Sequence, residues 1–354
     1  MHKIIFILLS LFATNSFAAE LADLYQSQAV VANQDDQERQ RVSPDILRQV
    51  LLKVVGDSAA LNAANLTPIL ANVDALVERA EYQQLQETLD DATPANQLAL
   101  SLTFNESAVN QVLTNNGLPI WSKMRPDVMV WLAIDDGHTK HIVASDDETQ
   151  YKKVVEQAAV RRGLPILLPI MDLQDQIQIS IDDISAGLAA PIQQASQRYG
   201  AKIILLAQLT HLADDDVKID WQSLIDDGVA SEQWQSQGNV TTALQAGIDQ
   251  FTDKVSRDFT QVVTDQEQNT TSTISTLEIA NVRDYADYSR AMTYLGRLQY
   301  VSDLQMVSME NETLAVTLQI KGDKSVFVRT LAIEHVIAKE GDNADDVMRY
   351  RLLP

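Results

Sequence analysis

The residues of this sequence that could do chemistry together are carboxylates placed after apolar segments. Asp135 directly follows the apolar run 128–134, and Asp172 and Asp175 follow the run 165–170. If these runs are parallel strands, their carboxyl ends meet at one edge of a sheet, where open α/β sheets bind their ligands. Carboxylates gathered at that edge could bind a cation or act as a general acid and a general base. The alternative is that Asp172 caps a backbone turn, and we favour this structural role.

Two histidines lie close to the first of these carboxylates. His138 and His141 are three residues apart, and two imidazoles at this spacing could join a metal ion with Asp135, Asp136 or Asp146. The alternative is a pair of solvated histidines in a turn, which we favour. We therefore predict no metal centre and no cofactor, with His138 and His141 as the residues to check.

The sequence lacks the motifs of the common nucleophile and phosphate sites. It has no G-x-S-x-G, no P-loop, no G-x-G-x-x-G and no H-E-x-x-H. With no cysteine, it also lacks thiolate nucleophiles and cysteine zinc sites. We therefore predict no catalytic residue. Arg161, Arg162 and Arg198 end two predicted helices, where a cation complements the helix dipole without any ligand.

The elements that would position these residues alternate between strand and helix. Apolar runs and helical patterns follow one another in the order 128–134, 148–162, 165–170, 180–199 and 203–209. This order predicts a small α/β domain with a parallel βαβαβ core. Pro191 lies inside the second helical pattern and predicts a kink or a break. The alternating segments 217–224 and 231–237 predict antiparallel strands that extend the same sheet.

The segments on either side of this core have other patterns. The N-terminal region mixes helical periodicity with alternating strands, and the C-terminal region has the order β-α-β-β-α of a ferredoxin-like domain. The predicted fold class is therefore mixed, α+β and α/β. The predicted parts are a signal peptide (1–18), an N-terminal α+β domain (19–122), a central α/β domain (123–264), a linker (265–276), a C-terminal ferredoxin-like domain (277–340) and a polar tail (341–354).

The charge and the first residues of the chain indicate its partners and its location. A net charge of −22 repels phosphate backbones, so we expect no nucleic-acid partner. Lys3, the apolar run 4–13 and the pattern Ser16-Phe17-Ala18 are typical of a signal peptide cleaved after Ala18. The apolar run is too short to cross a bilayer, so we expect a periplasmic protein without an integral membrane segment after cleavage. An uncleaved anchor is the alternative.

Several segments resemble one family of uncharacterised proteins. They are YQSQAVVANQDDQERQ (25–40), LRQVLLKVVGD (47–57), NESAVNQVLTNNGLPIW (105–121), RRGLPILLPIMDLQD (161–175), ASQRYGAKIILLAQL (195–209), SEQWQSQG (231–238) and LQAGID (244–249). On these segments the chain resembles the exported gammaproteobacterial proteins that carry domain of unknown function 2066 (DUF2066). The resemblance implies an exported bacterial protein of the cell envelope, and it brings no catalytic residues. Pro191 departs from the expected pattern.

Two functions are compatible with these features. We favour a non-catalytic binding or scaffold protein of the cell envelope, whose partner is another envelope protein. Trp131, Trp221 and Trp234 are assigned to packing in predicted strands, with a peptide- or peptidoglycan-binding surface as the alternative. The alternative function is a hydrolase or a metal-dependent enzyme with a carboxylate and histidine site at the strand ends of the central domain.

Overall fold

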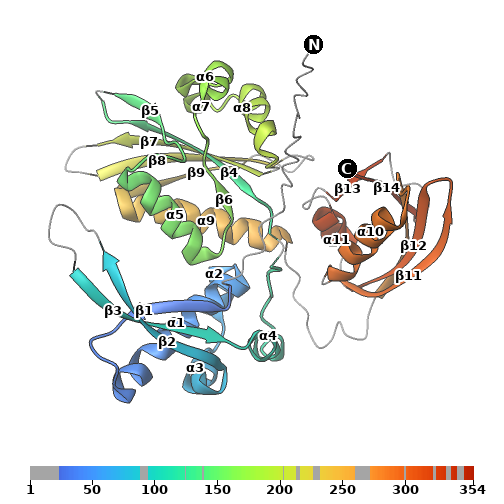
Figure 1. Cartoon of the computed structure of the whole chain (residues 1–354). Coiled ribbons are helices and arrows are strands. Elements are labelled where there is room, and N and C mark those ends of the chain that lie inside the picture. Colours follow the sequence, from blue (N-terminus) through green and yellow to red (C-terminus); the bar gives the residue numbers. More distant parts are fainter. Residues whose placement is uncertain are drawn as a thin grey trace, which may run out of the picture.

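The computed structural model describes most of the chain. The described residues are 24–87, 95–123, 125–137, 139–201, 203–212, 216–225, 232–259, 272–298, 300–321, 324–331, 336–340 and 347–354. The predicted signal peptide and His138 lie outside them. The described residues form three sheets, each with its own helices and its own hydrophobic core (Figure 1). The predicted fold class, a mixture of α+β and α/β, is confirmed.

The N-terminal sheet has three antiparallel strands in the order β1 (Gln26–Val30), β3 (Ala95–Phe104) and β2 (Val77–Glu87). The main helix of this part is α1 (Asp36–Val55), whose apolar positions recur every three or four residues and form a buried face, as at Ile46, Leu47 and Val50. Shorter helices complete the part: α2 (Ser58–Ala63), α3 (Thr67–Ala71), η1 (Val73–Ala75) and α4 (Glu106–Asn115).

The central sheet is built around a parallel pair, β4 (Val128–Asp135) and β7 (Ile203–His211), whose residues are mostly buried. Its other strands are β5 (Lys140–Ile142), β6 (Ile166–Leu167), β8 (Asp216–Ile225) and β9 (Glu232–Asn239). β4 runs parallel to β6 and β7, whereas β8 and β9 add to β7 as an antiparallel pair. The predicted parallel core with an antiparallel extension is therefore present. β5 and β6 pair with the same edge of β4: β6 pairs with its start and β5 with its end.

Helices cover both faces of the central sheet. The helices α5 (Gln150–Arg162) and α9 (Val240–Phe259) lie on one face, and α6 (Leu173–Gln178), α7 (Ile181–Ser185), α8 (Ala189–Ser196) and η2 (Gln197–Tyr199) lie on the other (Figure 1). The helical pattern 180–199 is thus broken in three. Pro191 lies in the first turn of α8, where its missing N–H has no intrahelical acceptor to lose.

The C-terminal sheet has the order β11 (Val301–Glu310), β12 (Thr313–Lys321), β10 (Ser272–Ala280), β14 (Val347–Leu352) and β13 (Ile337–Lys339). The helices α10 (Tyr285–Arg297) and α11 (Lys324–Leu331) complete the predicted β-α-β-β-α order. The predicted polar tail is wrong, because β14 lies inside the sheet, parallel to β10, and buries Met348, Tyr350 and Leu352. Alternate residues of this segment are apolar and form a buried face. The prediction of a polar tail considered only its charged residues. The predicted linker 265–276 also ends too late, since β10 begins at Ser272.

Two buried arginines join the N-terminal part to the central part. Arg125 is fully buried, stacks on Trp121 and donates hydrogen bonds to the carbonyl oxygens of Lys53 (2.7 Å) and Ser122 (3.0 Å). Arg162, 1% exposed, donates to the carbonyl oxygen of Gly56 (2.5 Å). Each arginine belongs to the central part, and each binds backbone carbonyls of the N-terminal part. These contacts hold α1 and α5 against each other.

Candidate functional site

The carboxylate Asp172 caps the start of α6. Its side chain accepts hydrogen bonds from the backbone N–H groups of Gln174 (3.0 Å) and Asp175 (3.1 Å). It also accepts from both terminal nitrogens of Arg198, at 2.7 and 2.9 Å. The hydrogen bonds from Arg198, followed by that from the Asp175 backbone, lower the pKa of Asp172 to about 2. This carboxylate is therefore ionised and fully engaged in holding local structure.

The carboxylate Asp175 belongs to the same cluster. It is fully buried and accepts hydrogen bonds from Arg198 (2.9 Å), from the hydroxyl of Tyr199 and from the backbone N–H of Met171 (3.0 Å). Burial, and then the hydrogen bond to Asp175, raise the pKa of Tyr199 to about 12. The two carboxylates share Arg198, and the sequence did not identify Arg198 and Tyr199 as their partners. The cluster ties α6 to η2.

The carboxylate Asp135 ends β4 and has a basic partner of its own. It pairs with Lys140 (3.0 Å) and accepts from the backbone N–H of Gly137 (3.0 Å). The hydrogen bond from Lys140 is the main cause that lowers the pKa of Asp135. His141 lies on β5 opposite Ile134. Within the residues that the structure describes, no three His, Cys, Asp or Glu side chains are grouped as metal ligands.

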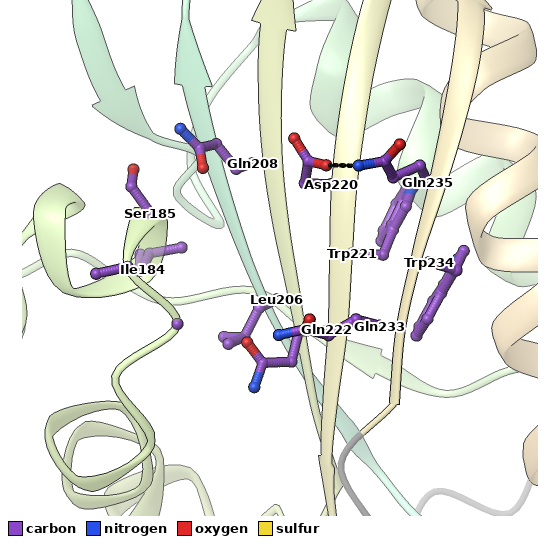
Figure 2. A pocket seen from close by; sticks show the side chains of 12 residues that line it. Ile184, Ser185, Leu206, Gln208, Asp220, Trp221, Gln222, Gln233, Trp234 and Gln235 are labelled. Carbon is purple, nitrogen blue, oxygen red and sulfur yellow. Dashed lines mark hydrogen bonds between the residues drawn. The ribbon is translucent and has the colours of Figure 1, made fainter.

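A polar pocket lies on the central sheet, where the helices α6 to α8 leave part of one face uncovered. Its volume is about 340 Å³. It is lined by Ile184, Ser185, Ala186, Gly187, Leu206, Gln208, Asp220, Trp221, Gln222, Gln233, Trp234 and Gln235. Figure 2 shows the polar side chains of β7, β8 and β9 on one face of the sheet, opposite the α7 segment. We call it the amide pocket, because four of these side chains are glutamines.

Strand register explains why the amides gather. Gln208 pairs with Asp220, and Asp220 pairs with Gln235, so these three side chains form one row across three strands. Gln222 and Gln233 form a parallel row two residues along. Residues two apart in a strand share a face, which leaves the odd positions of β8 for the opposite face.

The opposite face at this point is a packed aromatic layer. Trp221 and Trp234 stack with their ring centroids 6.0 Å apart, and Trp234 stacks on Phe251 of α9. The indole N–H of Trp221 donates to the hydroxyl of Ser236 (2.8 Å). The tryptophans therefore contribute backbone to the amide pocket while their rings pack against α9, as the sequence predicted for Trp221 and Trp234.

A glycine keeps the pocket open on its helical side. Gly187 follows α7 with φ +61°, a conformation that side chains rarely adopt. A Cβ atom at this position would lie 2.4 Å from Oε1 of Gln222. The amide of Gln222 therefore occupies space that any larger residue at 187 would take.

The side chains of the pocket can interact with a ligand mainly through hydrogen bonds. Each glutamine amide presents two donor hydrogens and one acceptor oxygen, and none of them titrates. Asp220 is already paired, with Lys218 (3.1 Å) and with the amide of Gln235 (2.5 Å). Such a surface can bind a polar, uncharged group. The sequence carried a signal for it, the glutamines at the alternate positions 233, 235 and 237 of one predicted strand.

Comparison with known proteins gives a family for the first third of the chain only. Residues 18–122 match a family model described as "Domain of unknown function (DUF8605)". The resemblance to DUF2066 is therefore wrong, since the matching model is that of a different domain and DUF2066 is not matched. The quoted segments are short and rich in common aliphatic and glutamine residues, which gives them little power to separate families. No curated protein matches the chain.

Similar solved structures are distant. A crystal structure of an uncharacterized protein is 11% identical, covers 38% of this chain and 91% of its own, and has a TM-score of 0.19. A homoserine dehydrogenase of S. aureus is 13% identical with a TM-score of 0.14, over 54% of this chain and 53% of its own. The chain thus spans about half the length of that enzyme. Similarity at this level carries no argument about function.

Proposed function

We propose that this protein is a non-catalytic binding protein of the cell envelope, exported to the periplasm, which holds a polar, uncharged segment of a partner protein in the amide pocket. The observation that carries the proposal is the double row of amide side chains on the uncovered face of β7, β8 and β9. Amides bind peptide groups well because they supply both donors and acceptors. The signal-peptide pattern in residues 1–18 and the absence of cysteine support the location.

The carboxylates favour binding over catalysis. Asp172 and Asp175 share Arg198, and Asp135 pairs with Lys140. An acid or base catalyst needs a pKa near the working pH, whereas the pKa values of Asp135 and Asp172 are lowered. The hydrolase alternative has no specific observation in its favour.

Site-specific photo-crosslinking tests the proposal. A photoreactive residue placed at the exposed Gln233 or Gln235 should give one protein adduct of the same mass in cells, whereas the exposed Gln305 of β11 should not give it. With the purified partner, the double variant Gln233→Ala/Gln235→Ala should bind about 5- to 160-fold more weakly, since each neutral hydrogen bond contributes about 0.5–1.5 kcal/mol. Equal adducts from all three positions, or an unchanged affinity of the double variant, would reject the amide pocket as the binding site.

A further inference from the structure

A second pocket lies between the N-terminal and central parts. It has a volume of about 550 Å³, and its lining residues lie on β1 and α1 on one side and on α5 on the other. It is lined by Ser27, Gln28, Gln49, Lys53, Lys153, Glu156, Gln157, Val160 and Arg161. We call it the cationic pocket, because its lining carries three basic side chains and a single acidic one.

The charges of this pocket oppose those of the whole chain. The chain has 49 acidic and 27 basic residues, yet Lys53, Lys153 and Arg161 face only Glu156 in the lining. Lys53 is 7% exposed, and its ammonium group donates to the carbonyl oxygen of Gln26 (2.9 Å), which fixes a charge at the inner wall. Lys153 is exposed at the mouth. Arg161 is paired with Asp249 (2.7 Å), and this carboxylate offsets much of its charge.

A buried cation behind the inner wall, Arg125, reinforces the positive potential of the pocket. Arg125 is fully buried and contacts the pocket through a hydrogen bond to the carbonyl oxygen of Lys53 (2.7 Å). The hydrogen bonds described for its guanidinium end on carbonyl oxygens of Lys53, Ser122, Arg162 and Gly163, which carry no net charge. A concave surface with charge of one sign behind low-dielectric walls focuses the potential and concentrates counter-ions.

We propose that the cationic pocket binds a small organic anion, whose carboxylate or phosphate group lies between Lys53 and Lys153. The exposed side chain of Val160 and the methylene stems of the lysines give the body of the ligand an apolar surface. The pocket is formed by β1, α1 and α5 and shares no lining residue with the amide pocket. The inference is thus independent of the proposed function.

Calorimetric titration of the full chain tests this site with two probes, inorganic phosphate and succinate, at low ionic strength. We expect saturable binding of at least one probe, and which of them binds identifies the anionic group. Lys153→Glu replaces an attraction by a repulsion at the mouth and should weaken binding by about tenfold or more. Binding should also weaken as salt is added, because the mouth is open to solvent.

The matched control is Lys339→Glu, which makes the same charge change on an exposed residue of β13, outside the pocket. It should leave the affinity within about twofold, since Lys339 belongs to the C-terminal sheet and does not line the pocket. Both lysines are exposed, so both variants should keep the melting temperature of the parent protein. The proposal is overturned if neither probe binds, or if the two variants lose affinity equally.

Discussion

Removing the guanidinium of Arg162 tests how the N-terminal and central parts are joined. Its Nη1 lies 3.1 Å from Oδ1 of Asp249, and its Nη2 contacts Asp253 and the carbonyl oxygen of Gly56. The variant Arg162→Met keeps an apolar stem and deletes these contacts. Removing one partner of a buried ion pair generally costs about 3–5 kcal/mol, because the other charge remains buried.

The structure places the expected loss near the lower end of that range. The side chain of Asp249 is 32% exposed and keeps its second partner, Arg161, so its share is small. The side chain of Asp253 is 18% exposed and keeps two donors from Ser58, the backbone N–H (2.9 Å) and the hydroxyl (2.5 Å). With the unpaired carbonyl of Gly56 added, we expect the free energy of unfolding to fall by about 3 kcal/mol.

The loss should depend on pH. Burial alone would raise the pKa of Asp253, but hydrogen bonds from Ser58 and Arg162 outweigh it and lower the pKa. A carboxylate whose pKa is lower in the folded state stabilises the fold above its unfolded pKa of about 3.9, and this stabilisation is lost as the pH falls through the folded pKa. Without Arg162 that contribution shrinks, so Arg162→Met should cost most at neutral pH and less below about pH 4.

Urea unfolding followed by tryptophan fluorescence measures these differences. The matched control is Arg161→Met, which removes a 36% exposed arginine from the same Asp249 and should cost less than about 1 kcal/mol. The double variant Arg162→Met/Asp253→Asn should recover about 0.5–3 kcal/mol relative to the sum of the single variants. If Arg162→Met costs no more than Arg161→Met, or if the double variant is additive, the Arg162–Asp253 pair does not support the contacts with Gly56 and Ser58 as we infer.

Two further predictions concern packing and acid stability. Gly247→Ala would place a Cβ atom 2.0 Å from the ring of Trp221 and should lower the free energy of unfolding by about 1–3 kcal/mol. Gly296→Ala, in open space on α10, should raise the free energy of unfolding by roughly 0.5–1 kcal/mol. Equal effects of the two variants in urea unfolding would contradict the packing of Gly247 against Trp221. Because the folded pKa of Asp172, about 2, lies below its usual value, its pairing with Arg198 stabilises the fold above about pH 4 and is lost toward pH 2. Asp172→Asn should therefore flatten the dependence of unfolding on pH in that window, and an unchanged profile would contradict the pairing.

The sequence predicts local elements in this protein better than it predicts partners across the fold. The parallel core and the break near Pro191 follow from periodicity and from proline stereochemistry, both of which act over a few residues. The cap formed by Asp172 is equally local, since its backbone partners are two and three residues away. Arg162 was assigned to the dipole of its own helix, but its partners Asp249 and Asp253 lie about 90 residues away, where spacing carries no signal.

The amide pocket and the last strand were missed for related reasons. The glutamines of β8 and β9 form rows only once the two strands are paired in register, and an alternating sequence does not state which face remains uncovered. The segment that forms β14 alternates clearly, yet its charged residues made it look like a solvated tail. In both cases the tertiary partner decides what the pattern means.

The helix α9 contacts all three parts of the molecule. It packs on β8, β9 and α5 in the central part, on α2 in the N-terminal part and on α11 in the C-terminal part. At its end, the carbonyl oxygen of Phe259 accepts a hydrogen bond from the hydroxyl of Tyr300 (2.8 Å). A helix of this length spans about 30 Å, so a tilt of about 5° around its first turn would move its last turn by about 2.6 Å. A small rotation of α9 against the central sheet would therefore displace the C-terminal part, which contacts the end of this helix.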